Sequence, residues 1–151
     1  MNRDAHDQWL HATIIRHCPD AILYTDREGI IRLWNEGAER IFRIAADEAL
    51  GKPLDLIIPE NLRKRHWDGY RQVMESGVTR YQTGLLAVPA LRGDGVRIST
   101  EFSILMVRDE AGTPVGCAAV LRDVSDRWKR EQDLKNRLIA MGTARYGDSG
   151  D

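Results

Sequence analysis

The chain is most constrained by the regular alternation of side chains between residues 96 and 107. Ile98, Thr100, Phe102, Ile104 and Met106 alternate with Ser99, Glu101, Ser103 and Leu105. A period of two residues is that of a β-strand with one buried face. The run Arg92-Gly93-Asp94-Gly95 comes just before this segment and is rich in turn residues. The segment is therefore predicted to be the second strand of an antiparallel hairpin.

Four other segments predict strands of the same sheet. Residues 81–91 precede the turn, and residues 115–121 are almost all apolar, which suits the centre of a sheet. Residues 21–26 and 30–34 flank a short turn in which Gly29 can supply a positive φ. We expect five antiparallel strands.

The residues between these strands predict short helices. Asn35 is suited to cap a helix over residues 36–42, and Gly51 closes another over residues 46–50. Pro59 opens a longer helix that runs to about Glu75 and stops at Ser76-Gly77. The expected inward face of this longer helix is formed by Leu62, His66, Tyr70, Val73 and Met74.

A helix is predicted at each end of the chain, outside the central domain. Residues 1–18 predict an amphipathic helix with Trp9, Leu10 and Ile14 on one face, and residues 19–124 form the central domain. Residues 125–142 predict a helix suited to signalling or dimerisation, and residues 143–151 a disordered tail. A coiled-coil-like stripe on the 125–142 helix comprises Val124, Trp128, Glu131, Leu134, Leu138 and Met141.

Composition excludes several classes of function. The 151 residues carry a formal net charge of −1, which gives no electrostatic case for binding nucleic acid or an acidic membrane. The sequence lacks a phosphate-binding glycine loop, a nucleophile elbow and a zinc-protease motif, so we expect no enzyme. Cys18 and Cys117 form no zinc-binding spacing and are expected to be reduced thiols in a cytoplasmic protein, although a redox disulfide stays open.

The order of these elements resembles the PAS fold, and five motifs in the family's order support that resemblance over about residues 12–130. The motifs are 26–31 in the first hairpin, 34–42 after it, Gly51-Lys52-Pro53, Arg92-Gly93-Asp94-Gly95 and 122–127. The resemblance implies an α+β domain with a five-stranded antiparallel sheet and short helices on one face. An N-terminal helix and a C-terminal coiled-coil-like helix flank it.

Within the PAS family, the segment 59–77 resembles the haem-binding branch of oxygen-sensor histidine kinases and haem-regulated phosphodiesterases. The resemblance rests on the spacing of Pro59, His66 and Gly77. It implies that His66 is the proximal ligand of haem b and that Tyr70 packs near the porphyrin. The distal position falls at Leu86 beside Leu85, where the related oxygen sensors carry an arginine. Other expected haem-site residues are Arg80 at a propionate and Leu105, Val107, Cys117, Ala119 and Leu121 around the pocket.

Two functions follow from these resemblances. The first is a sensor of a diatomic gas (O2, CO or NO) or of redox state, with haem iron bound to His66. An apolar distal side offers no hydrogen-bond donor to bound oxygen and favours CO, NO or an empty iron. The second is a PAS module that dimerises without a cofactor or binds another small molecule. In both, we expect a homodimer formed by the terminal helices and a downstream signalling protein or effector domain.

Overall fold

The computed structural model describes residues 2–78 and 86–147, with the side chains of Leu86 and of 143–147 excepted. The elements follow one another in a single order along the chain. They are α1 (Arg3–His17), β1 (Ala21–Asp26), β2 (Ile31–Trp34), α2 (Glu36–Phe42), α3 (Ala46–Ala49), η1 (Leu54–Ile57), η2 (Glu60–Leu62), α4 (Arg63–Ser76), β3 (Leu86–Leu91), β4 (Arg97–Arg108), β5 (Pro114–Asp123) and α5 (Ser125–Gly147).

The five strands form one antiparallel sheet in the order β2-β1-β5-β4-β3. This confirms the predicted sheet. Sequence neighbours pair at each end of the sheet, whereas β1 and β5 meet in its centre from opposite ends of the chain. The predicted strand over residues 30–34 begins at Ile31, because Ile30 bridges to Pro53 instead. Residues 81–85 of the predicted 81–91 strand lie outside the described residues.

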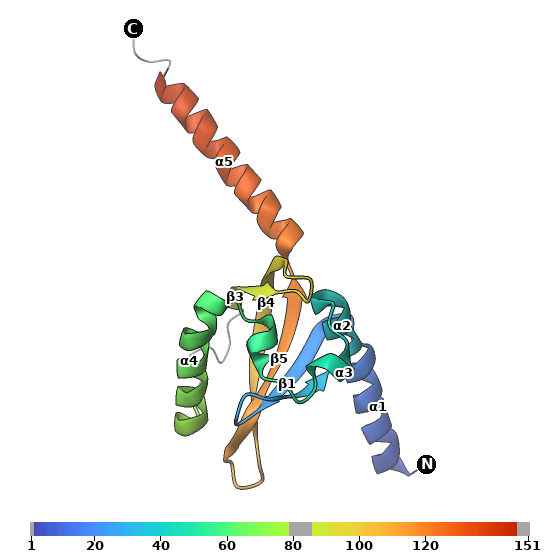
Figure 1. Cartoon of the computed structure of the whole chain (residues 1–151). Helices are drawn as coiled ribbons and strands as arrows, with labels where there is room; N and C mark the ends of the chain where they lie inside the picture. Colours follow the sequence, from blue (N-terminus) through green and yellow to red (C-terminus); the bar gives the residue numbers. More distant parts are fainter. Residues whose placement is uncertain (1, 79–85, 148–151) are drawn as a thin grey trace.

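The terminal helices differ from the sequence expectation in their packing and extent. None of the side chains of α1 is buried, and Trp9 and Ile14 expose 54% and 58% of their surface. The helix is confirmed, but its expected apolar face covers nothing within one chain. Helix α5 projects away from the sheet and runs to Gly147, so residues 143–147 are helical rather than part of a disordered tail (Figure 1). Residues 148–151 lie outside the described residues.

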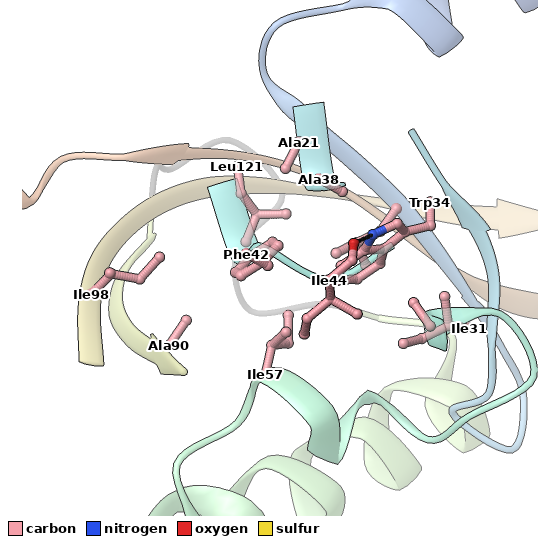
Figure 2. Close-up of a cluster of buried hydrophobic side chains, with 12 residues drawn as sticks. Ala21, Ile31, Trp34, Ala38, Phe42, Ile44, Ile57, Ala90, Ile98 and Leu121 are labelled. Carbon is pink, nitrogen blue, oxygen red and sulfur yellow. Dashed lines mark hydrogen bonds between the residues drawn. The ribbon is translucent and has the colours of Figure 1, made fainter. Parts of the chain in front are cut away.

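The core lies between the sheet and the short helices that follow β2. Phe42 of α2 and Ile31 of β2 are fully buried and meet Leu121 of β5 in one cluster (Figure 2). The rings of Trp34 and Phe42 pack with their centroids 5.4 Å apart, and the Trp34 indole donates a hydrogen bond to the Ile44 carbonyl at 2.9 Å. The core therefore fixes the first half of the chain against the central strand β5.

Asn35 joins four segments through one buried side chain. Its side-chain oxygen accepts hydrogen bonds from the N–H of Ile22 (2.8 Å) and, as the N-cap of α2, from that of Ala38 (2.9 Å). Its amide group donates to backbone carbonyls at the end of α1 and in the following turn: Ile15, Cys18 and Asp20. A single side-chain amide thus holds α1, β1 and α2 together. The sequence predicted the N-cap of α2, but not the bonds to α1 and β1.

Replacing Asn35 with alanine leaves buried backbone groups without partners. We expect Asn35→Ala to lower the free energy of unfolding by about 3 kcal/mol, because each unsatisfied buried group costs about 1–3 kcal/mol. Urea unfolding followed by circular dichroism measures the change. Asn136→Ala, at an exposed position of α5, is the control and should change stability by less than about 0.5 kcal/mol. Equal losses in the two variants would contradict the role assigned to Asn35.

No helix among residues 2–78 and 86–147 is long and apolar enough to cross a membrane.

Candidate functional site

Helix α4 carries the histidine singled out in the sequence. Pro59 is followed by one 3-10 turn, η2, and α4 begins at Arg63, later than predicted. The helix ends at Gly77, whose φ of 71° is left-handed and whose N–H donates to the Val73 carbonyl at 2.9 Å. Tyr70 and Met74 are buried while His66 is half-buried, so the predicted inward stripe is confirmed.

The imidazole of His66 has an unusual environment. Its Nδ1 atom is buried and has no hydrogen-bond partner among the described residues. Its ring lies edge-on to Trp67, with centroids 4.7 Å apart, and 5.9 Å from the ring of Tyr70. Burial lowers the pKa of His66, and the charge of Asp55 opposes that shift only in part. The imidazole is therefore neutral near pH 7, which is the form that binds a metal.

Trp67 fixes α4 against the first hairpin. Its indole N–H donates a hydrogen bond to the Asp55 carboxylate at 2.6 Å. The far edge of its ring lies over Gly29, where a Cβ atom would come within 2.1 Å of the ring. Gly29 also has a φ of 79°, as the sequence predicted for this turn. The same glycine therefore serves both the turn and the approach of α4.

Tyr70 fixes α4 against β1. Its hydroxyl lies 3.0 Å from the hydroxyl of Thr25 and is within donating distance of the backbone carbonyls of Thr25 and Asp26. Burial, followed by the nearby Cys117, Asp26 and Tyr24, raises the pKa of Tyr70 to about 12, against a smaller lowering by the Thr25 hydrogen bond. The Tyr70 phenol therefore stays protonated and available as a donor to β1.

The sheet presents two different faces to the residues predicted to line the pocket. Cys117, Ala119 and Leu121 alternate along β5 on the core side, where Leu121 is buried and Ala119 packs against it. In an antiparallel pair, directly opposite residues share a face. Leu105 lies opposite Ala118 and Val107 opposite Gly116, so both are on the other face, and Leu105 is 66% exposed.

The expectation that Leu105 and Val107 line the pocket beside Cys117 is therefore wrong. The strand residues on the core side are Phe102, Ile104 and Met106, which lie opposite Leu121, Ala119 and Cys117 respectively. The alternation of side chains in the sequence already separated this set from Leu105. Trp67 and Asp55 also belong to the site, and no sequence pattern marked their contact, because it depends on the bend between η1 and α4.

Three predicted residues lie at or beyond the edge of what the structure describes. Arg80 and Leu85 lie outside the described residues. The backbone of Leu86 pairs with Phe102 at the start of β3, and its side chain is not described. The apolar distal side and the propionate contact of Arg80 stay predictions.

A metal-binding cluster or a surface hollow would be another kind of candidate site among the described residues. No group of three or more histidine, cysteine or acidic side chains is placed to hold a metal ion within that part of the chain. One surface hollow of about 450 Å³ lies between α1 and β2, and another of about 210 Å³ lies on the outer face of the sheet beside Glu101 and Arg122. Neither hollow is lined by His66 or by any other residue of α4.

A family profile described as the PAS fold matches residues 15–129. The chain belongs to this family, whose members are sensory modules. The crystal structure of a PAS domain from Colwellia psychrerythraea superposes with a TM-score of 0.69 at 21% identity, covering 80% of this chain and 98% of that one. That likeness shows the same fold.

Two curated relatives are sensor proteins. The chain is 35% identical over 138 residues to the sensor protein FixL of Bradyrhizobium diazoefficiens, covering 84% of this chain and 25% of the relative. It is 26% identical over 121 residues to the oxygen sensor protein DosP of Escherichia coli, covering 80% of this chain and 15% of the relative. The chain thus spans about a quarter or less of the length of these relatives.

The contact between Trp67 and Gly29 can be tested by adding one methyl group. Gly29→Ala should destabilise the fold by about 2 kcal/mol more than Gly51→Ala, because the new Cβ would overlap the Trp67 ring. Gly51 is a matched control, since its φ of 84° imposes a similar backbone strain but no atom lies within 4 Å of an added Cβ. Chemical unfolding of both variants measures the difference. Equal destabilisation would show that the indole moves aside freely.

The hydroxyl of Tyr70 makes stability depend on pH in the alkaline range. A phenol whose pKa is raised from 10.0 to about 12 by folding stabilises the folded state fully below pH 10. We expect that contribution to be lost as the pH rises from 10 through 12. Urea midpoints measured from pH 8 to 12 should fall less steeply in Tyr70→Phe than in the wild type. Parallel slopes would contradict the assignment.

Proposed function

We propose that this chain is a PAS sensor module that binds haem b through His66 and responds to a diatomic gas or to redox state. The observation that carries the proposal is the buried Nδ1 atom of His66, which lacks a partner among the described residues. A buried polar atom without a partner is costly, so such a site is expected to serve a ligand.

The chemistry of the residues present fits the axial donor of a haem. A single neutral imidazole on a helix is sufficient, and the aromatic rings of Trp67 and Tyr70 beside it provide a largely apolar setting. Bound haem would supply an iron with a coordination position for O2, CO or NO. The similarity to a protein named as an oxygen sensor supports this choice of ligand class.

The route from His66 to the exit helix follows contacts that the described residues make. Tyr70, one turn after His66, reaches the backbone of Thr25 on β1. Thr25 pairs with Cys117 on β5, and β5 leads into α5. A shift of α4 would therefore reach α5 through β1 and β5, with the Tyr70 hydroxyl as the link.

Several finer features belong to the same proposal. The chain is itself non-catalytic and acts in the cytoplasm, as part of a two-component or related pathway. It forms a homodimer through α1 and α5, whose exposed apolar residues include Trp9, Ile14, Leu134 and Leu138. The signal passes to a downstream signalling protein or effector domain. The predicted apolar Leu85 and Leu86 favour CO or NO over O2.

A second function is favoured by the close contacts between α4 and the first hairpin. The indole ring of Trp67 already lies over Gly29, and the hydroxyl of Tyr70 is already satisfied by β1. These contacts hold α4 in place without a cofactor. On this alternative the chain is a PAS dimerisation module that binds no haem, or that binds another small molecule.

Absorption spectra of purified protein reconstituted with hemin distinguish the two functions. We expect a sharp Soret band in the wild type that is lost or shifted in His66→Ala, because the iron loses its protein ligand. His11→Ala is the matched control, since His11 is exposed on α1, and its spectrum should equal that of the wild type. Titration with O2, CO and NO then identifies the gas.

The absence of a specific Soret band would reject the haem proposal and leave the dimerisation module. An identical band in the wild type and in His66→Ala would show that haem binds without His66.

A further inference from the structure

A heptad pattern begins at Val124, just before α5, and continues along most of that helix. With Arg127 in place of Trp128 of the predicted stripe, regular steps of three and four residues connect Val124, Arg127, Glu131, Leu134, Leu138 and Met141. In the single chain, Leu134, Leu138 and Met141 expose 57%, 68% and 59% of their surface. Such spacing forms the seam along which two helices pack as a coiled coil. We call these six residues the α5 seam.

The α5 seam contains one basic and one acidic residue among its apolar residues. Arg127 and Glu131 occupy successive seam positions, and the Arg127 Nε lies 3.8 Å from the Glu131 carboxylate of the same helix. In a parallel pair of α5 helices, the two copies of Arg127 would face each other in one layer of the seam, and the two copies of Glu131 in the next. Each layer alone would therefore bring like charges together. Crossed pairs between Arg127 of one copy and Glu131 of the partner subunit neutralise both layers. This complementarity fits a second, parallel copy of the chain.

Arg127 is engaged by the sheet within its own chain. Its guanidinium donates a hydrogen bond to the carboxylate of Glu101 on β4. The Glu101 side chain is only 20% exposed, whereas that of Glu131 is 60% exposed. The less exposed carboxylate is the stronger competitor for the guanidinium, because water screens it less.

Glu101 lies at the junction of the sheet and α5. The Ser99 N–H donates to the Ser125 hydroxyl at 3.0 Å, and the Val124 N–H donates to the Ser99 carbonyl at 2.9 Å. These bonds fix the base of α5 to β4, two residues from Glu101. Glu101 also lies directly opposite Arg122 of β5, whose guanidinium is held by Asp20 at 3.0 Å. Glu101 therefore lies where β4, β5 and the base of α5 meet.

We propose that Glu101 of β4 and the partner's Glu131 compete for Arg127, so that the sheet sets the strength of the dimer. While Glu101 holds Arg127, the guanidinium is shared between Glu101 and Glu131 of its own chain. Less of its charge is then available to the partner's Glu131, and the seam is weak. Release of Arg127 allows the crossed pairs to form. This inference rests on the proposed pairing of two copies through α5, and it adds the residues by which the sheet regulates that pairing.

The competition predicts opposite effects from two carboxylates that contact the same arginine. Glu101→Gln keeps the side-chain shape and removes the charge, so it should lower the dimer dissociation constant roughly two- to fivefold. Glu131→Lys places four cationic groups, two from each copy, near one another and should raise the constant by about tenfold. Sedimentation equilibrium of the full chain, without hemin, measures both.

The controls separate this effect from a general change of charge. Asp133→Asn removes an exposed carboxylate of α5 outside the seam, and it should leave the dissociation constant unchanged. Glu101→Ala should change the constant in the same direction as Glu101→Gln, with circular dichroism confirming that both variants fold. Raising the salt concentration should reduce the difference between Glu101→Gln and the wild type.

The double variant Leu134→Asp and Leu138→Asp tests the pairing itself. If it weakens the dimer while Glu101→Gln leaves the constant unchanged or raises it, the competition is wrong and the pairing through α5 stands. If the double variant leaves the constant unchanged, the pairing and the competition are both overturned.

Discussion

The antiparallel pairing of β1 with β5 is the interaction on which the rest of the molecule depends. It brings Ala21 opposite Leu121 and Thr25 opposite Cys117, so residues from the two ends of the domain become neighbours. One strand, β1, receives the hydroxyl of Tyr70 from α4, while the other continues into α5. The candidate ligand site and the exit helix are thus attached to adjacent, hydrogen-bonded strands.

Local sequence signals were enough to predict most of the elements. The period of two in β4, Asn35 as a cap and Gly77 as a helix stop each act within a few residues, so they can be recognised without knowing the fold. The inward stripe of α4 followed from helical spacing alone, and it correctly grouped His66 with Tyr70 and Met74. The resemblance to the PAS family implied a five-stranded antiparallel sheet, but the order of its strands was not predicted, since no local signal joins β1 to β5.

The site was less predictable, because its contacts join distant segments. The indole of Trp67 meets Gly29 and Asp55 only after the chain has turned through η1 and η2. Leu105 and Val107 were misplaced because they are apolar, although their register puts them on the outer face. The apolar residues of α1 were likewise expected to pack, but they are exposed. Spacing identifies an apolar helix face and does not say which segment covers it.

His66 differs from its neighbours Trp67 and Tyr70 in how its polar atoms are satisfied. Trp67 donates a hydrogen bond to Asp55 of η1 and Tyr70 donates one to Asp26 of β1, so their polar atoms are satisfied and they account for the attachment of α4. His66 adds a buried nitrogen that has no hydrogen-bond partner among the described residues, and such an atom costs stability rather than supplying it. Natural sequences depart from consistent packing mainly where function requires it. A costly imidazole between two satisfied aromatic residues therefore supports the proposal that a ligand binds at this position of α4.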